Sequence, residues 1–113
     1  MADRGDVVQL KQHIGFESGS EGERFVVIQA SSLNAVLPTV IAVPLDPQVA
    51  TFDKSPLVVR VSAREAGASH NHVAVASWVQ VLATDRLVPG RVGALRDATM
   101  FALDATLRRV LDL

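Results

Sequence analysis

The sequence predicts a mainly β fold that is closed by one C-terminal helix, and three observations support this prediction. Short apolar segments rich in β-branched residues recur from residue 6 to residue 82, with glycine, proline or serine between them. One convincing helical period follows them, near the C-terminus. The composition, with 49% hydrophobic and 20% charged residues, is that of an ordinary folded protein. At 113 residues, the whole chain, residues 1–113, is expected to form one domain.

The first expected strands are defined by where apolar runs begin and end. Residues 6–13, DVVQLKQH, alternate apolar and polar side chains, and the glycine-rich residues 15–23 that follow predict a loop. Residues 24–30, RFVVIQA, and residues 39–45, TVIAVPL, are apolar enough to be buried on both faces of a sheet. Between these two strands, SSLNAVLP predicts a turn or a single helical turn that Pro38 ends.

Two later segments complete the predicted sheet. LVVRVS, residues 57–62, alternates and predicts a half-buried strand, and REAGASHNH after it predicts a loop. VAVASWVQVL, residues 73–82, predicts one long strand, because valines recur along one face. Trp78 and Gln80 would lie on the opposite face of that strand.

A helix is expected from about residue 97 to residue 111. Apolar side chains recur there at spacings of three and four residues, and these are Met100, Leu103, Leu107 and Val110, with Phe101 and Leu111 widening the stripe. Asp97 is the expected N-cap. Asp104 precedes Arg108 by four residues, in the favourable orientation for an ion pair on one helix face.

The composition excludes several classes of function. A formal charge of −1 and a pI near 6.3 supply no overall positive field, so any RNA contact would need a local patch. The absence of cysteine excludes disulfides, thiolate metal sites and a cysteine nucleophile. The N-terminus MADRGDVVQL lacks the apolar core of a signal peptide, and no segment is apolar enough to span a bilayer. We therefore expect a cytoplasmic protein with no membrane partner.

Histidines are the first candidates for metal or acid–base chemistry. His70 and His72 flank Asn71, a spacing that on a strand directs both side chains to one face, as in some metal pairs. No third ligand is close in the sequence, so we expect exposed loop histidines, no metal and no other cofactor. The sequence also lacks a phosphate-binding glycine motif and a nucleophile elbow.

Arg24 stands where the acidic, glycine-rich SGSEGE becomes an apolar strand. A guanidinium that is held there by the sheet and covered by a loop is suited to binding and stabilising a phosphoryl group. From spacing alone, a surface arginine that caps the strand is the simpler explanation. Carboxylates Glu17, Glu21 and Glu23 belong to a solvated loop or pair with Arg24.

The order of several motifs decides between these explanations. The segments RGDVVQL, GSEGERFVVIQASSLN, TVIAVPL, LATDRL and GRVGALRDATMFALDATLRRVLDL follow one another along the chain. Together they resemble the MazF/PemK toxin family over essentially the whole sequence. The resemblance implies an SH3-like (CcdB/MazF-like) β-barrel with a C-terminal helix. It also implies a homodimeric toxin of a toxin–antitoxin system.

The chemistry implied by the resemblance is sequence-specific cleavage of single-stranded RNA without a metal. A ribose 2′-hydroxyl attacks the adjacent phosphate and leaves a 2′,3′-cyclic phosphate and a free 5′-hydroxyl. The family's arginine after the GSE loop corresponds to Arg24, which would transfer a proton and stabilise the phosphorane. The implied protein partner is a cognate antitoxin whose disordered tail lies across the RNA groove.

Two departures from the family pattern affect this assignment. The proline after the arginine is Phe25 here, and matching Arg24 to the family requires a one-residue shortening, without which Glu23 takes the arginine's place. The family's catalytic threonine is Asp46. Its carboxylate can act as a general base towards the 2′-hydroxyl, but it also repels the scissile phosphate.

The expected RNA-contact residues are Glu21, Trp78 and Gln80. Gln80 stands where the family has an arginine, and Ser77 where it has an acidic residue. Trp78 can stack on an unpaired base, a contact worth about 1–3 kcal/mol. A core or dimer-interface tryptophan explains the same position at least as well.

The sequence thus predicts an endoribonuclease toxin with Arg24 as the principal catalytic residue and Asp46 at the second catalytic position. One alternative is a weakened or inactive family member that only binds an antitoxin or another protein. Asp46, Gln80 and the near-neutral charge favour that alternative. A more distant one is a gyrase poison that acts through the end of the last helix.

Overall fold

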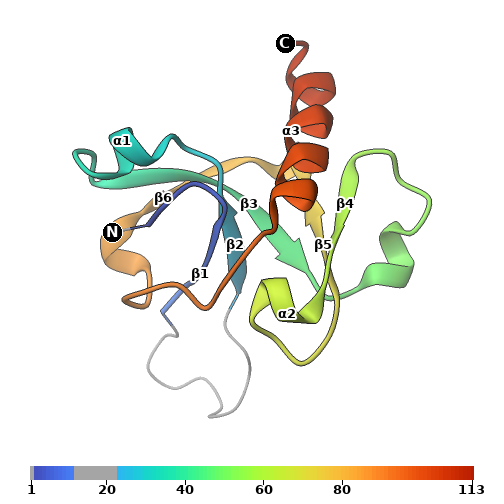
Figure 1. Ribbon diagram of the computed structural model, residues 1–113, viewed down its shortest axis with the longest axis horizontal. Coiled ribbons are helices and arrows are strands. Elements are labelled where there is room, and N and C mark those ends of the chain that lie inside the picture. The colour runs from blue at the N-terminus through green and yellow to red at the C-terminus, as the bar shows by residue number, and fades with distance from the viewer. Residues whose placement is uncertain (1, 12–22) are drawn as a thin grey trace.

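The computed structural model describes residues 2–11 and 23–113, and it shows a curled antiparallel sheet with a C-terminal helix, as predicted (Figure 1). The strands of the described chain follow the order β4-β5-β3-β2-β1-β7, with β6 also paired to β3. Their bounds are β1 Asp6–Gln9, β2 Arg24–Val27, β3 Thr39–Asp46, β4 Val58–Val61, β5 His72–Val75, β6 Gln80–Ala83 and β7 Gly93–Ala94. The helices are α1 Ser31–Asn34, α2 Ala63–Ala66 and α3 Asp97–Leu111, and 3₁₀ turns cover Val49–Phe52, Ala76–Trp78 and Thr84–Arg86. None of the helices in the described ranges has the length and apolar character that a membrane span requires.

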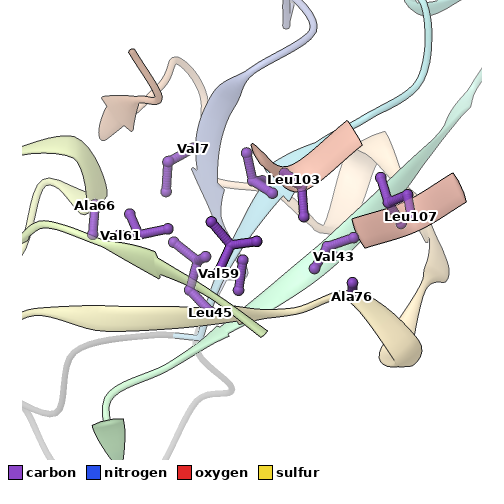
Figure 2. Packing of buried hydrophobic residues seen from close by; sticks show 11 residues of the cluster. Val7, Val43, Leu45, Val59, Val61, Ala66, Ala76, Leu103 and Leu107 are labelled. Atoms are coloured by element: carbon purple, nitrogen blue, oxygen red, sulfur yellow. The ribbon is translucent and has the colours of Figure 1, made fainter. Parts of the chain in front are cut away.

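Both faces of β2 are buried, as the sequence predicts, and β3 is largely buried on both faces, although Ile41 in its middle is exposed. On one face, Val43 packs with Leu103 and Leu107 of α3 (Figure 2), and Val26 belongs to the same cluster. On the other face, a second cluster of buried side chains consists of Val8, Phe25, Val27, Val40, Ala42, Leu82 and Leu87. Strands buried on two sides need apolar residues at successive positions, and this explains the unbroken apolar runs in the sequence.

The prediction of one long strand over residues 73–82 is wrong. The chain forms β5 and β6 instead, and the 3₁₀ turn Ala76–Trp78 separates them. Leu45 of β3 pairs with Ala74 of β5, and Ala42 of β3 pairs with Gln80 of β6. Between these two pairs the chain covers three positions in β3 but six positions from β5 to β6. The three extra residues form the turn. They let both strands pair with β3 while the sheet curls.

Helix α3 begins and ends where the sequence predicts, but its surroundings differ in detail. Leu103 and Leu107 are buried, whereas Phe101 and Leu111 are exposed, so the buried stripe is narrower than expected. The N-cap residue is Arg96, one position before the predicted Asp97. The sequence predicts Arg108, one turn away, as the ion-pair partner of Asp104, but in the structure the partner is an arginine from the other end of the chain. Arg4 Nη1 donates to Asp104 Oδ2 at 3.2 Å and joins the N-terminal segment to the helix.

Helix α2 lies in the segment that the sequence predicts as a loop. Ser62 and Glu65 form a reciprocal capping box, and Gly67 ends the helix with φ of 64°. A Cβ atom on Gly67 would lie 1.9 Å from the Val92 carbonyl oxygen, so no larger residue fits there. The spacing S-x-x-E was a visible signal for this helix start, although the helix itself is one turn long.

Candidate functional site

A pocket of about 490 Å³ opens where β2 begins and β3 ends. We call it the strand-end pocket, and its lining consists of residues 23–25, residues 44–47, His72, Trp78 and Gln80. Arg24, Asp46, Trp78 and Gln80, which the sequence predicts as site residues, are thus brought to one cavity. Glu21 lies outside the described residues.

A larger hollow of about 760 Å³ lies beside β1 and contains none of the predicted site residues. Its polar lining is engaged in structural contacts, because Arg91 Nη1 donates to Asp6 Oδ1 at 3.1 Å. The Asn34 amide donates to the carbonyls of Ala2 and Gln29. The strand-end pocket, although smaller, is therefore the better candidate for chemistry.

Arg24 is the first residue of β2, and its side chain is 8% exposed. It is therefore not an exposed capping arginine. Its backbone pairs with Leu45, and its Nη2 donates to the Gly67 carbonyl at 3.2 Å. Strand alternation places Arg24 on the face of Leu45 and Asp46 on the opposite face. Both line the same pocket because β2 begins and β3 ends there, so that side chains from both faces border it.

Gly67, whose carbonyl receives Arg24, ends helix α2, and this helix carries a buried carboxylate, Glu65. Burial alone would raise the pKa of Glu65, but hydrogen bonds from the Arg96 backbone, the Thr99 side chain and Ser62 lower this pKa below its ordinary value of 4.5. The Arg96 N–H lies 2.9 Å from Glu65 Oε2. An ionised Glu65 thus ties α2 to the segment that enters α3.

Asp46 ends β3 and is fixed by a local turn. Its Oδ1 accepts the Gln48 backbone N–H at 2.7 Å, and Pro47 lies between the two residues. This contact is an Asx turn, in which the side chain acts as an acceptor. A carboxylate held as an acceptor in this way suits uptake of a proton, and not the donor role of the threonine in the family pattern.

Trp78 lies at the rim of the strand-end pocket and is half exposed. It is therefore not a core tryptophan. Its ring meets Phe52 edge to face, with centroids 5.6 Å apart and planes at 85°. Gln80 Nε2 donates to the Trp78 carbonyl at 3.3 Å. The turn that interrupts the expected long strand is what brings Trp78 to this rim.

His72 is a pocket residue that the sequence did not identify as functional. The expectation of exposed loop histidines holds for His70 but is wrong for His72, which is 4% exposed because it begins β5 and pairs with Val61. Its Nδ1 lies 2.9 Å from the His70 carbonyl oxygen. The H-x-H spacing beside an apolar run was the available signal. In the ranges described, no three acidic or histidine side chains come together as a metal site.

The described lining carries both signs of charge. Arg24 is positive, and Glu23 and Asp46 are negative. A phosphodiester would be attracted by the first and repelled by the other two. Specific placement of a phosphate near the guanidinium, and not a broad positive surface, is what this pocket offers.

Comparisons with known proteins agree with this architecture. The sequence pattern of the family described as PemK-like, MazF-like toxin of type II toxin-antitoxin system matches residues 3–111. No curated protein sequence matches the chain.

Solved structures with a similar fold include mycobacterial proteins and proteins of Deinococcus radiodurans. An endoribonuclease in complex with its cognate antitoxin from a mycobacterial species has a TM-score of 0.73 and 20% identity, with 99% of this chain and 94% of that chain covered. The toxin MazF-mt6 of Mycobacterium tuberculosis has a TM-score of 0.74 and 17% identity, covering 94% and 96% of the two chains. A MazE-MazF structure from Deinococcus radiodurans has a TM-score of 0.75 and 18% identity, covering 99% and 97%. At these identities the likeness establishes the fold.

Proposed function

Because the chain belongs to the family of PemK-like, MazF-like toxins of type II toxin–antitoxin systems, we propose that it is the toxin of such a pair and an endoribonuclease. Its substrate is single-stranded RNA, cut at a short sequence without a metal. The observation that carries this proposal is the convergence of Arg24, Asp46, Trp78 and Gln80 on the strand-end pocket. The whole chain acts as one MazF-like domain.

The proposed reaction uses the RNA's own 2′-hydroxyl as the nucleophile. Asp46, held as an acceptor by its turn, takes the hydroxyl proton while the 2′-oxygen attacks the phosphorus. Arg24 stabilises the charge that develops on the phosphorane oxygens. The products are a 2′,3′-cyclic phosphate and a 5′-hydroxyl.

Base contacts come from the rim of the same pocket. Trp78 presents a half-exposed ring on which an unpaired base stacks. Gln80, exposed beside it, offers an amide that hydrogen-bonds to a base edge. Glu21 remains a proposed RNA contact on the basis of the sequence.

A cognate antitoxin is the proposed protein partner, and the chain is proposed to act as a homodimer in the cytoplasm. A similar mycobacterial endoribonuclease has been solved in complex with its cognate antitoxin. A disordered antitoxin tail that covers the strand-end pocket would block RNA there.

The test of cleavage uses a pooled library of single-stranded RNA in EDTA, with new 5′ ends mapped by sequencing. The wild type should cut at a defined short motif, and Arg24→Ala should cut about 10²–10³-fold more slowly, since removal of one charge-stabilising donor typically costs that much. Arg108→Ala, an exposed arginine of α3, is the matched control and should cut normally. Circular dichroism establishes that each variant is folded.

A second candidate function is binding without cleavage, which the two carboxylates in the pocket favour. In that case the folded wild type cuts no RNA in the library, yet binds a disordered acidic and apolar antitoxin segment. Cleavage that is unchanged in Arg24→Ala would contradict the assigned role of this arginine and leave the nuclease activity standing.

Dimerisation is tested by sedimentation equilibrium. We expect a mass twice the 12.1 kDa of the chain at micromolar concentration. Exposed large apolar side chains such as Val36, Val81 and Phe101 are available for such an interface. A mass of one chain at that concentration would refute the dimer.

A further inference from the structure

His72 is a buried imidazole that borders the strand-end pocket and that the proposed reaction does not yet use. It lies on β5, and the next residue, Val73, pairs with Asp46 of β3. The backbone of His72 is therefore one position away from the pair that Asp46 forms with Val73, and strand alternation directs the His72 side chain to the face of Arg24, opposite that of Asp46. Among the described residues, the charged groups that line this pocket are Glu23 and Arg24 from the beginning of β2 and Asp46 from the end of β3.

The hydrogen bond of His72 defines which ring nitrogen carries a proton. Its Nδ1 lies 2.9 Å from the His70 carbonyl oxygen. A carbonyl oxygen only accepts, so Nδ1 must be the donor. This leaves Nε2 as the nitrogen that exchanges protons. The His70 carbonyl thus orients the ring and remains bonded whether or not Nε2 is protonated.

The reaction proposed above still needs a proton donor. When the bond between phosphorus and the 5′-oxygen breaks, the leaving alkoxide must be protonated. The resemblance credits Arg24 with proton transfer as well as with stabilisation of the phosphorane. A guanidinium is a poor donor, because arginine keeps its proton at all ordinary pH values, so we assign Arg24 only the stabilising role. Asp46 accepts a proton in the same step and cannot also supply one. Histidine is the side chain that changes charge between pH 5 and 8, and it suits this role.

We infer that His72 is the general acid of the strand-end pocket, an inference that rests on the proposed ribonuclease function. The 2′-hydroxyl gives its proton to Asp46, the 2′-oxygen bonds to phosphorus, and the bond to the 5′-oxygen breaks. Nε2 of the protonated His72 transfers its proton to that oxygen, so a 5′-hydroxyl leaves. The enzyme then holds a protonated Asp46 and a neutral His72, and exchange with water restores both.

The first test compares His72→Asn with the wild type. An asparagine amide can keep the hydrogen bond to the His70 carbonyl, while Nε2 is lost, so the variant separates orientation from proton transfer. We expect kcat to fall by at least about 10²-fold, the usual lower contribution of general acid–base catalysis. The limb of the pH–rate profile along which the rate falls as the general acid loses its proton should also disappear. His70→Asn, which alters an exposed side chain and keeps its carbonyl, is the control and should retain full activity.

The second test uses an RNA substrate in which sulfur replaces the 5′-bridging oxygen at the cut. A thiolate leaves without protonation, so this substrate should restore His72→Asn to within a few-fold of the wild type and should leave Asp46→Asn impaired. Rescue is measured per folded molecule, after thermal unfolding has quantified the folded fraction. It therefore distinguishes loss of an acid from loss of structure.

The possible results distinguish failure of the inference about His72 from failure of the proposed ribonuclease function. If the wild type cuts and His72→Asn cuts equally well, the inference is wrong and the ribonuclease remains. If His72→Asn is slow on both substrates although it is folded, His72 has a role other than proton donation. If the wild type cuts neither substrate, the proposed function itself fails, and the role of His72 fails with it.

Discussion

At the scale of single residues, the chemistry of the strand-end pocket depends on which side chains the ends of β2 and β3 bring to it. Arg24 and Asp46 are one pairing position apart, since Arg24 pairs with Leu45, and their side chains leave the sheet on opposite faces. Only at the end of the strands can both border one cavity. The Gly67 carbonyl and the Gln48 N–H hold these two side chains in place. A phosphate would thus meet an arginine and a carboxylate that are already oriented.

Replacement of Asp46 separates its base function from its turn. Asp46→Asn keeps an oxygen for the Gln48 N–H but cannot take up a proton, so cleavage should fall about 10²-fold with little loss of stability. The measurement is the single-turnover cleavage rate on one mapped RNA site.

Asp46→Thr provides the contrasting variant, because it restores the residue type of the family pattern. If Asp46 is the working base, this variant is also slow. Faster cleavage by Asp46→Thr would show that the carboxylate hinders the reaction by repelling the phosphate.

At the scale of elements, the short helix α2 links the pocket to the end of the chain. Its last residues adjoin β7 so closely that a Cβ atom on Gly93 would lie 2.1 Å from the Glu65 carbonyl oxygen. Glu65 also bonds the Arg96 N–H at the beginning of α3. One turn of helix is not stable by itself, so the capping box and these tertiary contacts must stabilise it. The element that positions the Gly67 carbonyl for Arg24 is thereby also joined to the helix that covers the core.

The pH dependence of stability should contain a contribution from Glu65. Its pKa is lowered in the folded protein, so its contribution is fully present above the ordinary value of 4.5 and is lost as the pH falls through the lower folded value. Glu65→Gln leaves a buried donor without an acceptor and should reduce the free energy of unfolding at pH 7 by about 1–3 kcal/mol. Urea denaturation of both proteins at pH 7 and at decreasing pH below 4.5 measures this difference, which should shrink on acidification.

Glu23→Gln, the same chemical change at an exposed position, is the control for that experiment. Its free energy of unfolding should stay within about 0.5 kcal/mol of the wild type. A Glu65→Gln difference that is independent of pH would mean that lost packing, and not lost charge, explains the effect.

At the scale of the whole molecule, a curled sheet buries both faces of its central strands with few elements. Helix α3 covers one face (Figure 1), and on the other Val40 packs with Leu82 of β6 and Leu87. The curl depends on the break between β5 and β6, because both strands pair with β3 at different registers. The same break places Trp78 at the rim of the strand-end pocket. The turn that lets β6 cover the second cluster of buried side chains therefore also contributes a residue to the candidate site.

Stability of this arrangement should depend strongly on the core side of α3. Leu103 is fully buried, and Leu103→Ala should lower the free energy of unfolding by about 2–5 kcal/mol because a cavity remains beneath the helix. Arg108→Ala, on the exposed side of the same helix, should change it by less than about 0.5 kcal/mol. Guanidinium denaturation measures both, and equal effects would contradict this packing of α3.

The sequence by itself determined those features that depend on local pattern. The apolar runs of β2 and β3 predicted strands buried on two faces, and the spacing from Met100 to Val110 predicted α3. The order of motifs placed Arg24 and Asp46 at the two strand ends that meet in the strand-end pocket. These predictions held because side-chain period and strand punctuation are short-range properties.

Tertiary structure alone decided where the chain breaks its pattern and which distant residues meet. Valines recur along residues 73–82 and predict one strand, but pairing with β3 in two registers makes Ala76–Trp78 a turn. His72 was an ordinary loop histidine in the sequence, and it became a buried pocket residue because β5 aligns it beside the end of β3. The physical reason is that register and curl are set by long-range hydrogen bonds and by the burial of both sheet faces, which no local window of sequence contains.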